Sequence, residues 1–201
     1  SVFRDRRTLL RAMGFSGVSA LLGRAAETKD NVDLYPARQN LRYTLDRPIT
    51  PEHAATGYNN FYEFTTDKQR VKELVSSFKI DPWVVEVKGL VRKPGKYDFD
   101  EILRRFSLEE RLYRMRCVEA WSMAVPWTGF PVSALIKHVE PKPEARYLRL
   151  VTANRPDQMP GMRSQPHYPW PYFEALRLDE AMNELALFVT GIYGKPLPKQ
   201  N

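Results

Sequence analysis

The sequence predicts an α+β fold of mixed β-sheets with short helices and long loops. Stretches with the two-residue period of a strand are interleaved with short stretches of helical period, and loops containing proline or glycine separate them. The 201 residues are 43% hydrophobic and 12% aromatic, which is enough to bury a sizeable core. We therefore expect one domain, or part of a larger one.

The first 26 residues are typical of an export signal. Arg6 and Arg7 precede an apolar stretch over residues 12–22, which is too short to span a bilayer. Adjacent arginines in this position indicate the twin-arginine route. We expect residues 1–26 to bring the folded protein to the periplasm through the twin-arginine translocation machinery. The alternative is an amphipathic N-terminal helix with a solvated basic face.

The elements of the first half follow from local patterns. A polar, proline-containing stretch predicts an extended arm over residues 27–56, and residues 57–201 then form the folded domain. Helical spacing of apolar residues predicts a helix over 67–78. Alternation with β-branched residues predicts a strand over 83–91, and the sequence Lys-Pro-Gly-Lys predicts a turn over 93–96.

A helix and a strand are expected next. Residues 98–106 predict the helix, with Asp98 or Asp100 as its cap. Residues 111–118 predict the strand, which places alternate residues, Cys117 among them, on one face. If the extended conformation persists, Glu119 joins that face beside the sulfur.

The second half predicts four further elements and one long loop. Residues 131–139 predict a short helix with proline near its first turn. A strand is expected over 147–153, then a Pro- and Gly-containing loop over 154–172. A helical turn over 178–182 and a buried strand over 185–193 complete the order.

Charge and residue counts exclude several classes of site. Five of the first 26 residues are arginine and one is aspartate, so this segment accounts for +4 of the formal net charge of +7 and leaves +3 for the rest. No dense basic stripe with interleaved aromatics follows, so we expect no nucleic-acid partner. A single cysteine and three widely spaced histidines exclude an internal disulfide and a Cys- or His-based zinc or iron–sulfur cage within this chain.

The segment over residues 111–123 contains the strongest chemical signal. Three arginines approach Cys117, and positive charge beside a thiol favours the thiolate, which is both a nucleophile and a metal ligand. A soft thiolate beside Glu119 and Trp121 suits a soft metal site. The alternative is a buried structural cysteine, with the arginines paired to nearby glutamates.

Two long motifs carry a family resemblance. Residues 114–123 read Arg-Met-Arg-Cys-Val-Glu-Ala-Trp-Ser-Met, and residues 58–64 read Tyr-Asn-Asn-Phe-Tyr-Glu-Phe. Together they resemble the catalytic subunits of periplasmic protein-methionine-sulfoxide reductases. The resemblance runs from the leader through residues 191–201, and several long motifs in the right order are more specific than one short pattern.

The resemblance implies a sulfite oxidase-type fold that binds Mo-molybdopterin without an attached nucleotide. Cys117 matches the protein ligand of the molybdenum, and Glu119 matches a carboxylate near the metal that orients water or relays protons. The other positions that match cofactor contacts are Asn59, Tyr62, Glu63, Thr152 and Asn201. Each has an ordinary structural alternative: a turn, a core or a strand residue, or, for Glu119, the partner of an arginine.

The resemblance also implies a function and partners. The enzyme would reduce methionine sulfoxide in oxidised periplasmic proteins, with electrons from a membrane haem-binding subunit linked to quinones. The family continues beyond residue 201 with basic residues and strands that complete the grip on the cofactor's phosphate, so we expect this chain to be a C-terminally incomplete fragment. The residues alone leave three alternatives open: a sulfite- or small-sulfoxide-active relative, a non-catalytic exported binding protein, and a metal-free thiol enzyme with His138 as its base.

Overall fold

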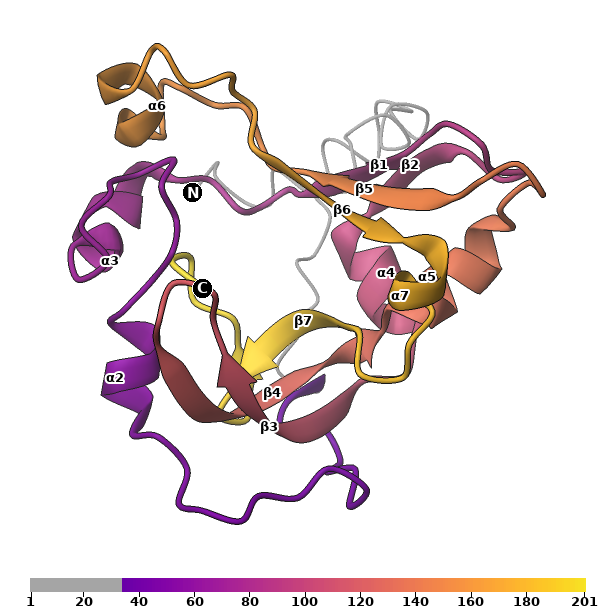
Figure 1. Cartoon of the computed structure of the whole chain (residues 1–201), viewed down its shortest axis with the longest axis horizontal. Coiled ribbons are helices and arrows are strands. Elements are labelled where there is room, and N and C mark those ends of the chain that lie inside the picture. Colours follow the sequence, from indigo (N-terminus) through magenta and orange to yellow (C-terminus); the bar gives the residue numbers. More distant parts are fainter. Residues whose placement is uncertain (1–33) are drawn as a thin grey trace, which may run out of the picture. The chain divides into compact units, whose positions relative to one another are not determined.

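The computed structural model describes residues 34–201 (Figure 1). The chain divides into two compact units, residues 1–30 and 31–201, and every element below belongs to the second. The predicted export signal over residues 1–26 lies outside the described residues. Within the described part, no helix is long and apolar enough to cross a membrane.

The main sheet is antiparallel, with strand order β3–β4–β7–β8. Its strands are β3 (Glu109–Arg116), β4 (Ser122–Pro131), β7 (Leu187–Ile192) and β8 (Lys195–Pro196). The pairing of β4 with β7 shifts register between Thr128 and Gly129. A side chain at Gly129 would collide with the backbone carbonyl of Phe188, so only glycine allows β7 to approach here.

Two smaller antiparallel sheets accompany the main one. The first pairs β1 (Val84–Val87) with β2 (Gly95–Asp98). The second pairs β5 (Tyr147–Val151) with β6 (Phe173–Arg177). Together with the short helices between them, these sheets confirm the predicted α+β class.

The helices are short: α2 and α3 precede the first strand, and the others connect later strands. They are α2 (Glu52–Thr56), α3 (Val71–Leu74), which continues into the 3-10 turn Val75–Ser77, α4 (Phe99–Arg105), α5 (Val132–Val139), α6 (Pro160–Ser164) and α7 (Leu178–Ala181). The backbone N–H groups of Asp100 and Glu101 donate to the Asp98 side chain, which confirms Asp98 as the cap of α4. The predicted helix over 67–78 is confirmed in a shorter form, and the predicted loop over 154–172 contains α6.

The structure differs from the prediction at several elements. The turn predicted over 93–96 is wrong at its end, because Gly95 and Lys96 begin β2. The strands β2, β4, β6 and β8 were not predicted, and neither was α2, which forms the end of the predicted extended arm. Most of β4 is buried and it contains Pro126 and Gly129, so the alternation that reveals a half-exposed strand is missing from its sequence.

The core consists of three clusters of buried side chains. The first joins residues 61–83 to α6 and contains Phe64, Val71, Val75, Phe78, Met159 and Met162. The second joins α2 to the main sheet through Ala55, Val125 and Ile192. The third joins α5 to α7 through Val132, Ile136 and Ala181. Phe61 packs against the first cluster, which therefore contacts the segment over residues 57–63.

The described part of the predicted arm runs along the main sheet. Gln39 forms a parallel bridge with Glu110 at the free edge of β3. The N–H of Thr50 donates to the carbonyl of Ala124, and the Tyr35 hydroxyl donates to the carbonyl of Thr190, each at 2.8–2.9 Å. The arm therefore covers part of an edge that would otherwise expose unpaired backbone groups.

Candidate functional site

Cys117 lies at the point where β3 ends and the chain turns back into β4. Its N–H donates to the carbonyl of Trp121 at 2.9 Å, and its carbonyl accepts from the N–H of Ala120 at 3.2 Å. Ala120 has a φ of 63°, in the left-handed region. The expectation that Glu119 continues the extended strand is therefore wrong: it reaches the neighbourhood of the sulfur from the turn.

A group of polar side chains surrounds the thiol, and we call Asn60, Tyr62, Lys68, Cys117 and Glu119 the Cys117 cluster. The Asn60 Nδ2 donates to the Cys117 Sγ at 3.4 Å. The Lys68 Nζ donates to the Asn60 Oδ1 at 2.7 Å and to the Tyr62 hydroxyl at 2.9 Å. The carboxylate of Glu119 is paired with Lys68 and accepts from the Tyr62 hydroxyl. The cluster thus joins two segments that are about fifty residues apart in the sequence.

The partner of Glu119 is a lysine, not one of the three arginines near Cys117. Arg111 is paired with Glu109, and its side chain is 4% exposed. Its guanidinium also lies 4.4 Å from the centre of the Tyr43 ring, so Arg111 belongs to the packing of β3. The alternative that pairs the arginines with nearby glutamates is therefore correct for Arg111 and Glu109. It is wrong for Glu119, whose partner is Lys68.

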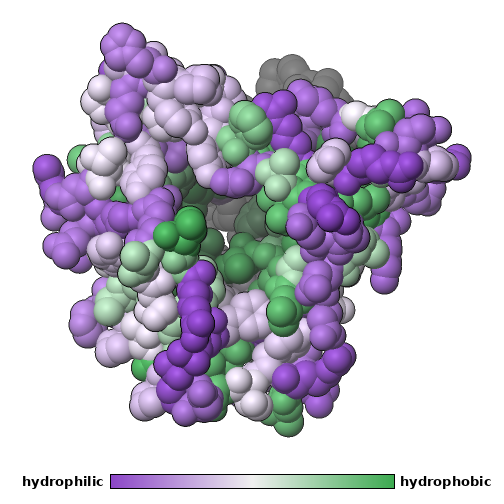
Figure 2. Space-filling model, in the orientation of Figure 1, coloured by the Kyte–Doolittle hydropathy of each residue, from purple (hydrophilic) through white to green (hydrophobic). Residues whose placement is uncertain are grey.

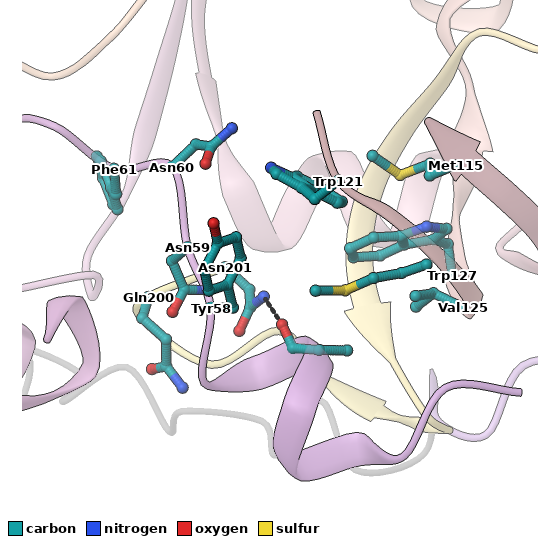
Figure 3. Close-up of a pocket in the computed structure, with 12 residues that line it drawn as sticks. Tyr58, Asn59, Asn60, Phe61, Met115, Trp121, Val125, Trp127, Gln200 and Asn201 are labelled. Carbon is teal, nitrogen blue, oxygen red and sulfur yellow. Dashed lines mark hydrogen bonds between the residues drawn. The ribbon is translucent and has the colours of Figure 1, made fainter. Parts of the chain in front are cut away.

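A cavity of about 320 Å³ lies beside the Cys117 cluster. It is built by α2 with the following segment, by the β3–β4 hairpin, and by the last two residues. Figure 3 shows these residues around the cavity. The rings of Tyr58 and Trp121 are arranged edge to face, with their centres 6.3 Å apart. The lining residues are Ala55, Tyr58, Asn59, Asn60, Phe61, Met115, Trp121, Met123, Val125, Trp127, Gln200 and Asn201.

Several polar atoms of this lining are buried without a hydrogen-bond partner in the described residues. They are the Oδ1 atoms of Asn59 and Asn201 and the indole Nε1 atoms of Trp121 and Trp127. A buried polar atom left unpaired costs about 1–3 kcal/mol, so such atoms are normally satisfied. Two acceptors and two donors among the lining residues therefore suit a polar ligand that carries both kinds of group.

The predicted site residues fall into separate groups. Cys117, Glu119 and Tyr62 meet in the Cys117 cluster, while Asn59 and Asn201 line the cavity. Glu63 is 4% exposed and its Oε1 has no hydrogen-bond partner in the described part, so it too has a buried polar atom to satisfy.

Thr152 stands apart from the other predicted residues. Its N–H and its Oγ1 both donate to the carbonyl of Tyr172, at 3.0 and 3.2 Å, and it does not line the cavity. In the described chain no hydrogen bond joins Thr152 to another predicted site residue. Its contact with the cofactor stays a prediction.

The sequence interpretation missed Asn60, Lys68 and Trp127 as members of the site, whereas it did place Trp121 beside the thiolate. The aromatic and asparagine motif over residues 58–64 was a signal for Asn60. Trp121 stands in the cysteine motif itself. Nothing in the local sequence marks Lys68, because its partners are reached only through the fold.

The described residues supply one thiol and no complete metal cage. No group of three or more His, Cys, Asp or Glu side chains within residues 34–201 is arranged to hold a metal ion. A metal at Cys117 would therefore take its other ligands from a cofactor. His138 contacts the rings of Tyr97 and Phe106 and, in this part of the chain, forms no hydrogen bond to Cys117, which argues against a cysteine–histidine thiol enzyme.

Hydrophobic and hydrophilic residues occupy different parts of this face of the molecule. Figure 2 shows hydrophobic residues gathered at the hollow in the centre of this face and hydrophilic residues on its rims. An apolar hollow with a few polar groups is the usual setting of a small-molecule or cofactor site.

Comparisons with known proteins identify the family of this chain. The family model described as "Oxidoreductase molybdopterin binding domain" matches residues 72–201. The chain is 45% identical to the protein-methionine-sulfoxide reductase catalytic subunit MsrP of Pseudomonas syringae pv. tomato, over 100% of this chain and 65% of the relative. It is 44% identical to the MsrP of Burkholderia mallei, over 100% of this chain and 62% of the relative.

The chain spans less than two thirds of the length of these relatives. Among solved structures, the sulfane dehydrogenase SoxCD from Paracoccus pantotrophus matches 95% of this chain and 52% of its own, with a TM-score of 0.49 and 14% identity.

Proposed function

Since the chain belongs to the oxidoreductase molybdopterin binding domain family, we propose that it carries the catalytic site of a reductase that repairs methionine sulfoxide in oxidised proteins. Relatives that match the whole chain are named protein-methionine-sulfoxide reductase catalytic subunits. The observation that carries the proposal is the position of Cys117: its sulfur is held by Asn60 beside a cavity lined with unpaired polar atoms.

The residues of the site fit Mo-molybdopterin. Cys117 would give its sulfur to the molybdenum, and the unpaired atoms of Asn59, Trp121 and Asn201 would bind the polar edge of the pterin. When bound, the cofactor supplies two-electron oxygen-transfer chemistry, while the protein supplies binding, orientation and electrostatics.

In sulfoxide reduction, the Cys117 cluster can supply a proton to the departing oxygen and hold the proton-carrying groups in place. The sulfur–oxygen bond breaks, the sulfur is reduced to a thioether by two electrons, and the oxygen leaves as water after it takes two protons. The Tyr62 hydroxyl and the Glu119 carboxylate share a hydrogen bond, so this pair can hold a proton for the departing oxygen. Lys68 holds both groups in place.

The partners and the location are part of the proposal. Electrons would come from a membrane haem-binding subunit linked to quinones, and the substrates would be oxidised periplasmic proteins. The arginine pair and apolar stretch of residues 1–26 support export by the twin-arginine machinery. A folded, cofactor-loaded protein is consistent with that route.

Molybdenum quantification on the full-length protein tests the proposal. We expect bound molybdenum and methionine-sulfoxide reduction in the wild type, and the loss of both in Cys117→Ala. The matched control is Ala120→Ser, which changes the same turn and leaves the sulfur in place. A wild type without molybdenum would refute the proposal.

A substrate comparison decides the specificity. Turnover of an oxidised protein should exceed turnover of small sulfoxides and of sulfite at equal concentration of reducible groups. The reverse order would identify a small-sulfoxide or sulfite enzyme instead.

A further inference from the structure

Lys68 is the most enclosed charged group of the Cys117 cluster, and neither sequence motif includes it. Its side chain is 17% exposed, whereas the Glu119 side chain is 31% exposed. The ammonium lies 5.2 Å from the centre of the Tyr62 ring and 5.9 Å from that of Tyr58, which lines the cavity. A lysine held by this many groups loses the rotational freedom that makes exposed lysine ion pairs weak.

The hydrogen bond from Lys68 determines which way the Asn60 amide faces. An ammonium is only a donor, so it accepts no hydrogen bond from an amide N–H. With the Lys68 Nζ 2.7 Å from the Asn60 amide, the oxygen must face Lys68. The amide N–H must then face the Cys117 sulfur, at 3.4 Å.

A sulfur that accepts such a bond differs electronically from a bare one. A hydrogen bond to a ligating sulfur withdraws electron density from it and shifts the reduction potential of the metal. If Asn60 were rotated by half a turn, its carbonyl oxygen would face the sulfur and repel it. The Asn60 amide can therefore present either a donor or a repelling oxygen to the sulfur. The Lys68 ammonium, on the other side of the amide, determines which of the two faces the sulfur.

We propose that Lys68 is a positioning residue, which fixes the Asn60 amide with its N–H toward the Cys117 sulfur and so tunes a metal bound there. This inference rests on the proposed function for its catalytic consequence only. Lys68 does not touch the sulfur; it acts through Asn60 and holds Glu119 and Tyr62 on the same side.

The first experiment uses cofactor-free protein and needs no activity. The Asn60 side-chain amide is assigned in a proton–nitrogen NMR spectrum by its absence in Asn60→Ala. We expect Lys68→Met to displace this signal and Lys68→Arg, which is again only a donor, to retain it. The control is Lys72→Met, which removes the same charge from an exposed lysine four residues away.

The second experiment uses the loaded enzyme. Loss of a partner behind a metal ligand typically lowers activity by roughly 10–100-fold. We expect Lys68→Met to lower kcat by that factor with little change in KM, and to shift the midpoint potential of the molybdenum, with recovery in Lys68→Arg. If Lys68 had only a structural role, Lys68→Met would lower thermal stability and leave the midpoint potential of the folded enzyme unchanged.

The outcomes separate this inference from the proposed function. The role of Lys68 would be overturned if Lys68→Met and Lys72→Met showed the same Asn60 amide signal and the same midpoint potential of the molybdenum. If Lys68→Met does not fold, Asn60→Asp removes the N–H at nearly constant size, and an unchanged potential there overturns the inference equally. A wild type without molybdenum refutes the function, while the NMR experiment still decides what Lys68 does to the amide.

Discussion

Glu110 shows how the arm affects a single residue of β3. Its N–H donates to the carbonyl of Arg38 and its carbonyl accepts from the N–H of Asn40, both at 2.8–2.9 Å. The Glu110 side chain is partly buried, and this burial raises the pKa of its carboxyl above the usual value of 4.5. The charged form is therefore disfavoured in the folded protein.

This shift predicts a dependence of stability on pH. A group whose pKa is raised by folding binds more protons in the folded state, so its contribution is present at low pH and is lost as pH rises through the folded pKa. We expect Glu110→Gln to be more stable, relative to the wild type, around pH 7 than around pH 4. Urea unfolding at both pH values measures this.

The control for this prediction lies in the same strand. Glu109 is paired with the buried Arg111, so Glu109→Gln should be destabilising at neutral pH. Equal behaviour of the two variants would contradict the assignment of the shift to Glu110.

At the scale of elements, α6 is held against the segment that carries the predicted site residues. The N–H of Met162 donates to the carbonyl of Glu63 at 3.2 Å, and the Gln165 side chain donates to the carbonyl of Tyr62 at 3.3 Å. A side chain at Gly161 would collide with the Tyr62 carbonyl oxygen and would lie 2.7 Å from the Glu63 carbonyl carbon.

Gly161→Ala should therefore displace this segment. Because the obstacle is backbone and not a flexible side chain, we expect a loss of about 1–3 kcal/mol in unfolding free energy. We also expect a lower molybdenum content per folded protein. The control is Gly95→Ala, whose added methyl group has its nearest neighbour at 3.7 Å on the Tyr97 ring. Equal metal content in the two variants would show that α6 does not support the site.

The elements differ in how far sequence alone predicts them. The helix α4 was predictable because its start is marked locally by the Asp98 cap and its inner face by Ile102 and Leu103. The strand β4 was not, because burial on the main sheet removes the alternating pattern. Strands of this kind are recognised by their partners, and pairing partners are not visible in a local window.

The same limit applies to the site. Cys117 and the Asn59–Glu63 region stand in long motifs, so they were predictable. The pairing of Lys68 with Glu119 depends on a turn at Ala120 that brings the carboxylate back toward the loop over residues 57–70. No spacing rule in the sequence contains that turn.

At the scale of the whole molecule, the three core clusters differ in their relation to the site. Met159 is fully buried in the cluster that packs against Phe61, and Phe61 lines the cavity. Ile136 is buried in the cluster between α5 and α7, none of whose members lines the cavity. Stability and function should therefore be separable.

Truncation of each residue tests this separation. Met159→Ala and Ile136→Ala should each cost about 2–5 kcal/mol, because both leave a cavity in a packed core. Only Met159→Ala should also reduce molybdenum content and sulfoxide reduction, measured under conditions in which both variants are folded. An equal loss of metal in Ile136→Ala would mean that the site responds to global stability alone.

The hydrogen bond from the Asn201 amide to the carbonyl of Ala55, at 3.3 Å, bears on the order in which the protein matures. A ribosome releases Ala55 early, and its partner emerges 146 residues later. Until then the wall that Gln200 and Asn201 give to the cavity does not exist. A prosthetic group could accordingly settle in the complete cavity only after this stretch has been synthesised.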